Sequence, residues 1–396
     1  MIRFFKQWPV ILTVFTLSSA TFSCSHQPTA NVDEAPLELT TQIQPPLLTQ
    51  EEIARLPNVS DIFRLSDQQL ADFQDYYQKQ LARGVKPHKV VANYIQAYSY
   101  QFNYMGKTFI ATDTLSDEAG NCMSLAVLTT ALAKTVNLEI DYKLVISEPI
   151  FSKESNVVTY SRHVQSRIFE REQTQVPSSN YIVKPHVIID YFPNPRSVVG
   201  QYINSEEFLS LYYQNVAAEA LFDDNLDLAY YYAYQAYSKT PKDSASRNLM
   251  AVMSRRLNLD NQAEAIYNDI LADESDNLFA LHNYHALLLS QQREDEAKRI
   301  EERFQYAQDP NPFYLMALGD EYLASNDLHL ALKYYDKAID KAPYLVEPYQ
   351  KAIKIFKLRG KSRKQREYLA QALNWIDNHQ DRSQLKYKVY GRNTQF

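Results

Sequence analysis

Glycine is scarce in this sequence of 396 residues, which contains only seven. That is about a quarter of the ~7% glycine content of an average protein. Neither a G-x-G-x-x-G nor a G-x-x-x-x-G-K-[ST] segment occurs, and in those motifs the glycines let the backbone approach a phosphate group. The composition therefore argues against a nucleotide-dependent enzyme, and we expect no cofactor.

Basic residues are not in excess either. Lysine and arginine number 41 against 47 aspartates and glutamates, which gives a formal net charge of −6 at pH 7. A nucleic-acid-binding protein needs a basic surface to neutralise phosphates, so we expect no nucleic-acid partner. A chain of this length with 45% hydrophobic residues can bury more than one core, at roughly 100–200 residues a domain.

The first 23 residues have the layout of a secretory signal peptide. Arg3 and Lys6 are basic, a largely apolar run covers residues 8–17, and small residues follow at 18–20. This apolar run is too short for a permanent membrane-spanning helix. We therefore interpret residues 1–23 as a signal peptide.

Cys24 follows this segment directly, within Ser23-Cys24-Ser25. The arrangement resembles the lipobox of bacterial lipoproteins. That resemblance implies lipidation of Cys24, a two-chain membrane anchor and a place in the bacterial cell envelope; Ser25 implies the outer membrane, with the protein facing the periplasm. The alternative is ordinary signal cleavage with Cys24 incidental. Residues 24–49 carry several prolines and no periodic apolar face, so we expect a flexible tether.

The C-terminal half repeats with a period of 34 residues. Alanines recur at this spacing at positions 229, 263, 297 and 331. One unit resembles the tetratricopeptide repeat at all eight signature positions: Leu315, Leu318, Gly319, Tyr322, Ala331, Tyr335, Ala338 and Pro343. Such units stack pairs of helices into a solenoid. We predict an all-α solenoid of four to five repeats over residues 206–380, a tail over 381–396, and a protein partner bound on the solenoid.

Residues 50–205 show helical patterns first and alternating patterns afterwards. Ser66 and Gln69 form a capping-box pattern that opens a helix to about Arg83, and a second helix is expected over residues 88–103. A third helix begins at Cys122 and runs to about residue 136. Strands are predicted over residues 140–145, 162–168 and 181–191. Helices followed by antiparallel strands indicate an α+β domain.

Cys122 is the candidate nucleophile of this domain. The sequence has two cysteines, so a lipidated Cys24 would leave Cys122 alone and would exclude a disulfide scaffold or a multi-cysteine metal site. A thiolate is stabilised at a helix N-terminus by the dipole and the free backbone N–H groups. A histidine base and a group that orients it are still required.

The order of motifs resembles the transglutaminase-like superfamily, whose members have a papain-type cysteine fold. The resemblance lies in the Gly120-Asn121-Cys122-Met123-Ser124 helix start, the Arg162-His163-Val164 strand and the Asp190-Tyr191 strand end, followed by tetratricopeptide repeats. It implies Cys122 as nucleophile, His163 as general base and Asp190 as the carboxylate that orients it. The backbone N–H of Cys122 is one candidate oxyanion donor, with a side chain of Tyr104, Gln101 or Gln96 as another.

Each of these residues has an alternative interpretation. Cys122 could be a small buried apolar residue, and Asp190 a plain carboxylate at a strand end. His186 could be the base in place of His163. His186 and Asp190 could also share a metal ion, but two ligands without a third make a weak site, so we expect no metal.

Two functions from different classes therefore compete. The first is an envelope lipoprotein whose cysteine cleaves or transfers amide bonds of a protein or peptide through a thioester, with the membrane contacted through the lipid anchor only. The second is a non-catalytic adaptor that uses its repeats to bind other proteins. An intact Cys-His-Asp set favours the first, and we expect hydrolysis rather than cross-linking.

Overall fold

The computed structural model describes residues 43–154, 157–170, 184–191, 198–304 and 311–377. Their side chains are described except those of residues 146–163, 198–199 and 373–377. The predicted signal peptide, the lipidation site Cys24 and the tail over 381–396 lie outside the described residues. Among the helices that are described, none is both long and apolar enough to span a bilayer.

The described chain begins with four helices. They are α1 (Gln50–Ala54), α2 (Val59–Ile62), α3 (Asp67–Ala82) and α4 (Pro87–Ser99). The capping box predicted at Ser66 and Gln69 opens α3, since each residue's side chain bonds the backbone N–H of the other. After α3 the chain turns at Gly84, whose φ of +81° favours glycine.

The second of the predicted helices ends earlier than its sequence indicated. We expected it to reach residue 103, but α4 stops at Ser99. Asn103–Tyr104 instead forms the short strand β1, which pairs in parallel with β2 (Ala119–Gly120). The helix prediction was wrong here because this pairing is non-local, and local propensity does not encode it.

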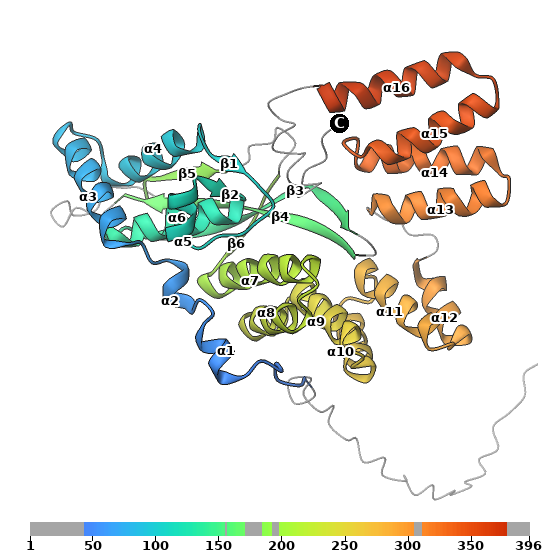
Figure 1. The fold of residues 1–396 in the computed structure, drawn as a ribbon, viewed down its shortest axis with the longest axis horizontal. Coiled ribbons are helices and arrows are strands. Elements are labelled where there is room, and N and C mark those ends of the chain that lie inside the picture. Colours follow the sequence, from blue (N-terminus) through green and yellow to red (C-terminus); the bar gives the residue numbers. More distant parts are fainter. Residues whose placement is uncertain (1–42, 155–156, 171–183, 192–197, 305–310, 378–396) are drawn as a thin grey trace, which may run out of the picture. The chain divides into compact units, whose positions relative to one another are not determined.

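An antiparallel four-stranded sheet follows helices α5 (Ala111–Asp117) and α6 (Cys122–Thr135). Its strands are β3 (Ile140–Glu154), β4 (Val157–Phe169), β5 (His186–Asp190) and β6 (Val198–Ile203), in the order β5-β4-β3-β6. The predicted change from helices to antiparallel strands is therefore confirmed, whereas β6 was not predicted. Figure 1 shows the helices beside the sheet.

One face of this sheet is buried and the other is partly exposed. Val164, Ser166 and Ile168 on β4 are buried, and the strand packs against α6. On the opposite face Ile188 and Tyr202 are about half exposed. The buried face carries α6, so the N-terminus of that helix is held close to the strands.

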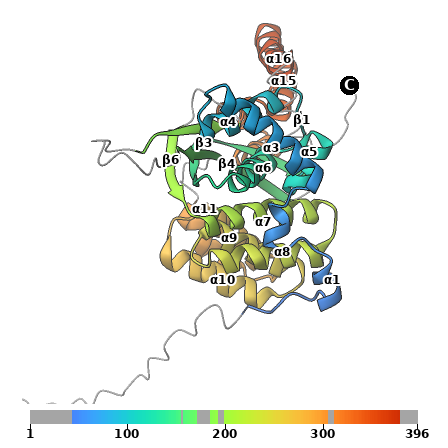
Figure 2. The same ribbon diagram turned by 90° about the vertical axis from the view of Figure 1, so that its left-hand side faces the viewer.

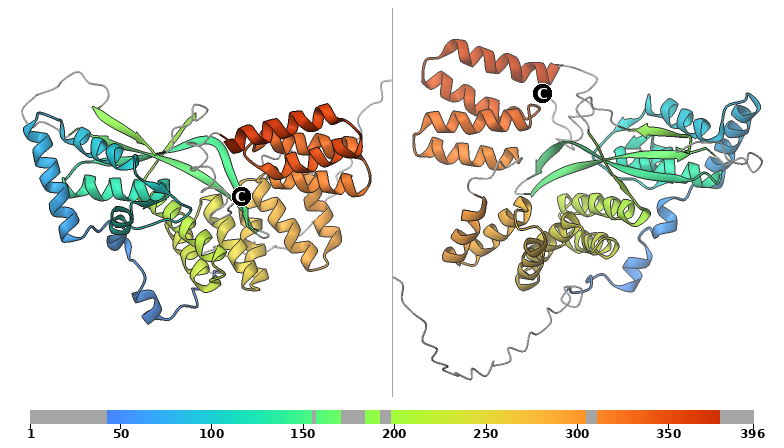
Figure 3. Two further views of the ribbon diagram at one scale, coloured as in Figure 1. Left: turned by 45° about the horizontal axis from the view of Figure 1, so that its top comes forward. Right: turned by 180° about the vertical axis from the view of Figure 1, so that it is seen from behind.

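The C-terminal half is built of helix pairs, as the repeat predicted. The helices are α7 (Ser205–Phe222), α8 (Leu226–Lys239), α9 (Ser244–Arg256), α10 (Asp260–Asp273), α11 (Leu278–Ser290), α12 (Glu294–Phe304), α13 (Pro312–Ala324), α14 (Leu328–Lys341), α15 (Val346–Leu358) and α16 (Ser362–Asp377). The four alanines spaced by 34 residues are all buried. Figure 2 shows α7 to α10 side by side, and Figure 3 shows α13 to α16 stacked in two antiparallel pairs.

Small residues bring the two helices of a repeat together. A Cβ atom added at Gly319 in α13 would lie 2.5 Å from the ring of Tyr335 in α14. Tyr335 is fully buried, as are Tyr230, Tyr267 and Tyr349. Several of the 30 tyrosines of the sequence thus pack within the repeats.

The hydrophobic core does not stop at the first repeat helix. One continuous cluster of buried side chains runs from Ile43 through the sheet and on to Phe304 in α12. At the junction the rings of Tyr142 in β3 and Phe208 in α7 stack, with centroids 4.0 Å apart. Helices α13 to α16 form smaller clusters of their own.

Candidate functional site

The Gly120-Asn121-Cys122 segment has a local structural explanation. Gly120 has φ +141°, and a Cβ atom there would lie 2.5 Å from Ser124 Oγ. Asn121 caps α6: its Oδ1 accepts from the backbone N–H of Ser124 at 3.0 Å, and Ser124 Oγ accepts from Asn121 N–H at 3.2 Å. Cys122 therefore becomes the first helical residue, half-buried, where backbone N–H groups have no partner within the helix.

The loop before this helix is fixed from two sides. Phe109 N–H donates to Ser124 Oγ at 2.9 Å, and Asn121 Nδ2 donates to Thr108 Oγ1 at 2.7 Å. From the first repeat helix, Glu219 Oε1 accepts the backbone N–H of Thr108 at 2.8 Å. Glu219 in the first repeat helix is thus linked through Thr108 to Asn121, the cap of α6.

Tyr104 lies beside the cysteine. Its Cα pairs with that of Gly120 across β1 and β2, two residues before Cys122. Its hydroxyl donates to the backbone oxygen of Tyr191 at 2.9 Å. Burial raises the pKa of Tyr104 to about 12, and the charges of Cys122 and Asp190 act in the same direction. Cys122 and Asp190 therefore each lie close enough to Tyr104 for their charges to affect its pKa.

Asp190 and His163 lie on neighbouring strands. Asp190 ends β5 opposite Gln165 on β4, and Gln165 Nε2 donates to Asp190 Oδ2 at 2.7 Å. His163 precedes Gln165 by two residues on β4 and pairs with Val145 on β3. The side chain of His163 lies outside the described part, so its role as base stays a prediction.

The alternative base His186 occupies the other end of β5. It lies four positions before Asp190, which at ~3.3 Å a residue is about 13 Å along the strand. Its Nδ1 contacts the backbone oxygen of Lys184 at 2.9 Å. This distance disfavours His186 as a base oriented by Asp190. It also separates His186 from Asp190 as joint metal ligands, and the described residues contain no group of three potential ligands.

Among the side chains considered as oxyanion donors, Tyr104 is close enough to Cys122 for the charge of the cysteine to raise its pKa. Gln96 and Gln101 are exposed. Because the Tyr104 hydroxyl donates to a backbone oxygen, it would have to leave that bond in order to serve an oxyanion.

Two features of the site were missed from the sequence. Gln165, the partner of Asp190, carries no sequence signal because the bond depends on strand register. The cap formed by Asn121 and Ser124 does carry a sequence signal. A polar residue followed three positions later by another, before an apolar run, is the pattern of a capped helix start.

The fold thus comprises an α+β domain followed by helix pairs of the tetratricopeptide type. No protein-family model matches the chain, and comparison with curated proteins finds no matching sequence. Among solved structures, the chain is similar to MamA from Desulfovibrio magneticus RS-1, at 16% identity over 43% of this chain and 97% of that one, with a TM-score of 0.28. It is also similar to PilF of Pseudomonas aeruginosa, at 19% identity over 46% and 82%, with a TM-score of 0.33. Because these TM-scores are low, the repeat architecture is inferred from the helix pairs themselves.

Proposed function

We propose that this protein is an interaction scaffold whose repeats bind an extended segment of a partner protein. The observation that carries the proposal is that two consecutive repeats already bind the backbone of one residue of their own chain, Gln44, which lies before the first helix. Gln44 N–H donates to Gln262 Oε1 in α10 at 2.7 Å, and Gln44 O accepts from Tyr230 OH in α8 at 2.7 Å. Both backbone groups of one residue are therefore bound by side chains from two consecutive repeats.

The two side chains that bind Gln44 are themselves fixed. Gln262 Nε2 donates to Ser254 Oγ at 2.7 Å and to Tyr230 OH at 3.0 Å. Gln262 is only 7% exposed, so its orientation is determined by the packed repeat. Pre-organised donors and acceptors bind a backbone with little loss of side-chain entropy, and they recognise a segment without requiring a particular side chain.

A peptide competition tests this proposal. A labelled peptide copying residues 39–48 is titrated with the full chain and with a Gln44→Pro variant, which lacks the N–H that Gln262 accepts. Since a tethered segment competes at an effective concentration of order mM, we expect the variant to bind the peptide at least tenfold more tightly.

The second variant in this test is Gln262→Ala, placed in the Gln44→Pro background. It should abolish the gain, whereas Gln371→Ala, at an exposed glutamine of α16, should leave it intact. If releasing the tethered segment does not improve peptide binding, the repeats do not recognise backbone in this way and the proposal fails.

A second function is favoured by the surroundings of Cys122. We infer a transglutaminase-like acyl transfer in which Cys122 attacks an amide carbonyl, His163 takes its proton and returns it to the leaving amine, and water releases the acyl group from the thioester. The supporting observations are that Cys122 starts a capped helix and that the charges of Cys122 and Asp190 both act on Tyr104. This arrangement provides the helix N-terminus that a thiolate needs.

Alkylation of Cys122 tests this second function. In a Cys24→Ala chain Cys122 is the sole thiol, so iodoacetamide uptake measures its reactivity directly. An ordinary thiol reacts faster only as the pH approaches ~8.5, whereas a thiolate paired with protonated His163 should react well below about pH 7. His163→Ala should remove this reactivity and Asp190→Asn should reduce it less.

The His186→Ala variant is the control for that experiment, because His186 lies at the far end of β5. Uptake that rises only above about pH 8 and ignores the loss of His163 would leave the scaffold function standing alone.

We also propose that lipid on Cys24 anchors the protein to the periplasmic face of a bacterial outer membrane, as the lipobox-like segment implies. Labelled palmitate should enter the wild-type protein and not a Cys24→Ala variant. An unlabelled, water-extractable wild type would contradict the anchor and the localisation with it.

A further inference from the structure

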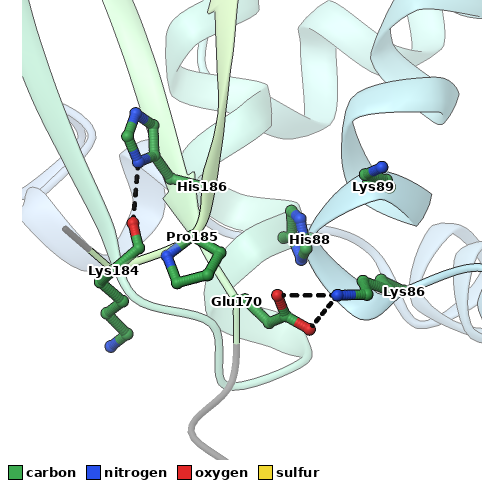
Figure 4. A pocket seen from close by; sticks show the side chains of 7 residues that line it. All are labelled: Lys86, His88, Lys89, Glu170, Lys184, Pro185 and His186. Atoms are coloured by element: carbon green, nitrogen blue, oxygen red, sulfur yellow. Dashed lines mark hydrogen bonds and ion pairs between the residues drawn. The ribbon is translucent and has the colours of Figure 1, made fainter. Parts of the chain in front are cut away.

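A pocket of about 400 Å³ opens at the N-terminus of α4, away from Cys122. Lys86, His88 and Lys89 line it from the start of the helix. From the strand side it is lined by Glu170, Lys184, Pro185 and His186, as Figure 4 shows. The two groups of residues are 81 to 100 positions apart in the sequence.

The pocket is rich in positive charge. Three lysines face one glutamate, and Lys86 pairs with that Glu170 at 2.9 Å. Lys184 pairs with Glu139, which does not line the pocket. Lys89 forms no ion pair with any residue in the described part of the chain. One ammonium group is therefore available to a ligand.

The helix end adds donors to this charge. The N-cap residue Lys86 makes no side-chain capping bond, and Pro87 occupies the first turn of α4. The backbone N–H of His88, within the first turn, therefore has no partner inside the helix, and the positive end of the helix dipole faces the pocket. Helix N-termini of this kind bind phosphate and carboxylate groups.

The buried side chain of His88 distinguishes this pocket from an ordinary helix N-terminus. Its side chain is only 2% exposed, and its Nδ1 has no hydrogen-bond partner among the described residues. A buried polar atom without a partner is costly, and native proteins satisfy nearly all of them. His88 lines the pocket, so a ligand there can provide the missing partner.

We propose that this pocket binds an oxyanion, the phosphate group of a small ligand or of a lipid headgroup. Lys89 and the start of α4 bind the anion, and His88 donates to it. Since the volume exceeds that of a phosphate ion, the remainder of the ligand lies between α4 and the start of β5. The site goes beyond the scaffold and acyl-transfer functions and does not depend on either.

Protonation of His88 should respond to the ligand. Burial lowers the pKa of His88, Glu170 raises it, and the positive charges of Lys86, Lys89 and His186 lower it. A bound anion would favour the protonated ring. Phosphate should therefore raise the pKa of His88, which NMR titration of the imidazole signals measures.

Calorimetric titration of the full chain with inorganic phosphate tests the site itself. Lys89→Gln removes the available ammonium group without breaking an ion pair in the described structure, and should weaken binding about tenfold. Lys79→Gln is the matched control: this lysine of α3 lies outside the pocket, is exposed and pairs with Asp75. It should bind phosphate as the wild type does.

Vesicles containing a phosphate-headgroup anionic lipid distinguish the two sources of the anion. The Cys24→Ala chain is used so that no attached lipid contributes. Binding to vesicles without binding of free phosphate, lost in Lys89→Gln, assigns the site to a lipid headgroup. Loss of binding to the same extent in Lys79→Gln, or no binding in either arm, overturns the proposal.

Discussion

Glu219 links the repeats to the loop before Cys122, and its titration offers a direct test of that link. The carboxylate accepts the backbone N–H of Thr108 at 2.8 Å. Burial raises the pKa of Glu219 to about 7, and nearby Asp223 acts in the same direction, while the bonds from Thr108 and the charge of Lys107 oppose the rise. The folded protein therefore keeps a proton on Glu219 at pH values where the unfolded chain has released it.

The sign of the pH dependence follows from this difference. A group that binds its proton more tightly in the folded state stabilises the fold at low pH, and this contribution is lost as the pH rises. The loss begins near the ordinary value of 4.5 and is complete just above the raised value of about 7. The free energy of unfolding decreases by at most about 3 kcal/mol through this titration.

The Glu219→Gln variant removes this titration and keeps the bond, because an amide oxygen also accepts the N–H of Thr108. We expect its free energy of unfolding to be close to that of the wild type at pH 5. At pH 8 the variant should be more stable than the wild type by up to about 3 kcal/mol. Urea unfolding at pH 5, 6, 7 and 8 measures the difference.

A matched control is Glu321→Gln, at an exposed glutamate of α13. It should change stability by roughly 0.5 kcal/mol or less at every pH. If the Glu219→Gln and wild-type curves stay parallel from pH 5 to pH 8, Glu219 is not buried against the loop as described, and the link between repeat and cysteine helix is refuted.

Three further changes test the packing. Gly319→Ala should cost about 1–3 kcal/mol, because the added methyl group meets the Tyr335 ring; thermal unfolding of the last repeats would reveal an unexpected tolerance. Phe208→Ala should cost about 3–5 kcal/mol and also loosen the sheet, since its ring stacks on Tyr142; near-ultraviolet circular dichroism checks this, and an unchanged signal would argue against the shared core. Asn121→Ala should cost about 0.5–2 kcal/mol in a chemical denaturation, and a neutral result would mean that the cap is dispensable.

The repeats were predictable because their information is local. Each pair of helices contacts the next pair along the chain, so a period of 34 residues in small and aromatic positions specifies both the helices and their stacking. Buried Ala263 and Ala331 occupy the positions that this period assigned to them. The start of α6 at Cys122 was predictable for a similar reason, since its cap lies within four residues of sequence.

What failed to be predicted depends on distant backbone contacts. The second predicted helix ends early because Tyr104 pairs with Gly120, sixteen positions later. Gln165 meets Asp190 only through the register of two strands. The pocket joins His88 to His186 across almost a hundred positions, and neither residue carries a sequence pattern that would indicate the other.

The continuous core from Ile43 to Phe304 has a consequence for cooperativity. Sequence motifs divide the chain near residue 205, where the repeats begin, but buried side chains cross that boundary without interruption. Amide protons of α7 and α6 should therefore exchange with solvent through the same opening event. Those of α13 to α16 should exchange through separate openings. A transfer of the α+β domain to another protein would have to carry α7 with it, because the helix that opens the solenoid also closes the core of the domain before it.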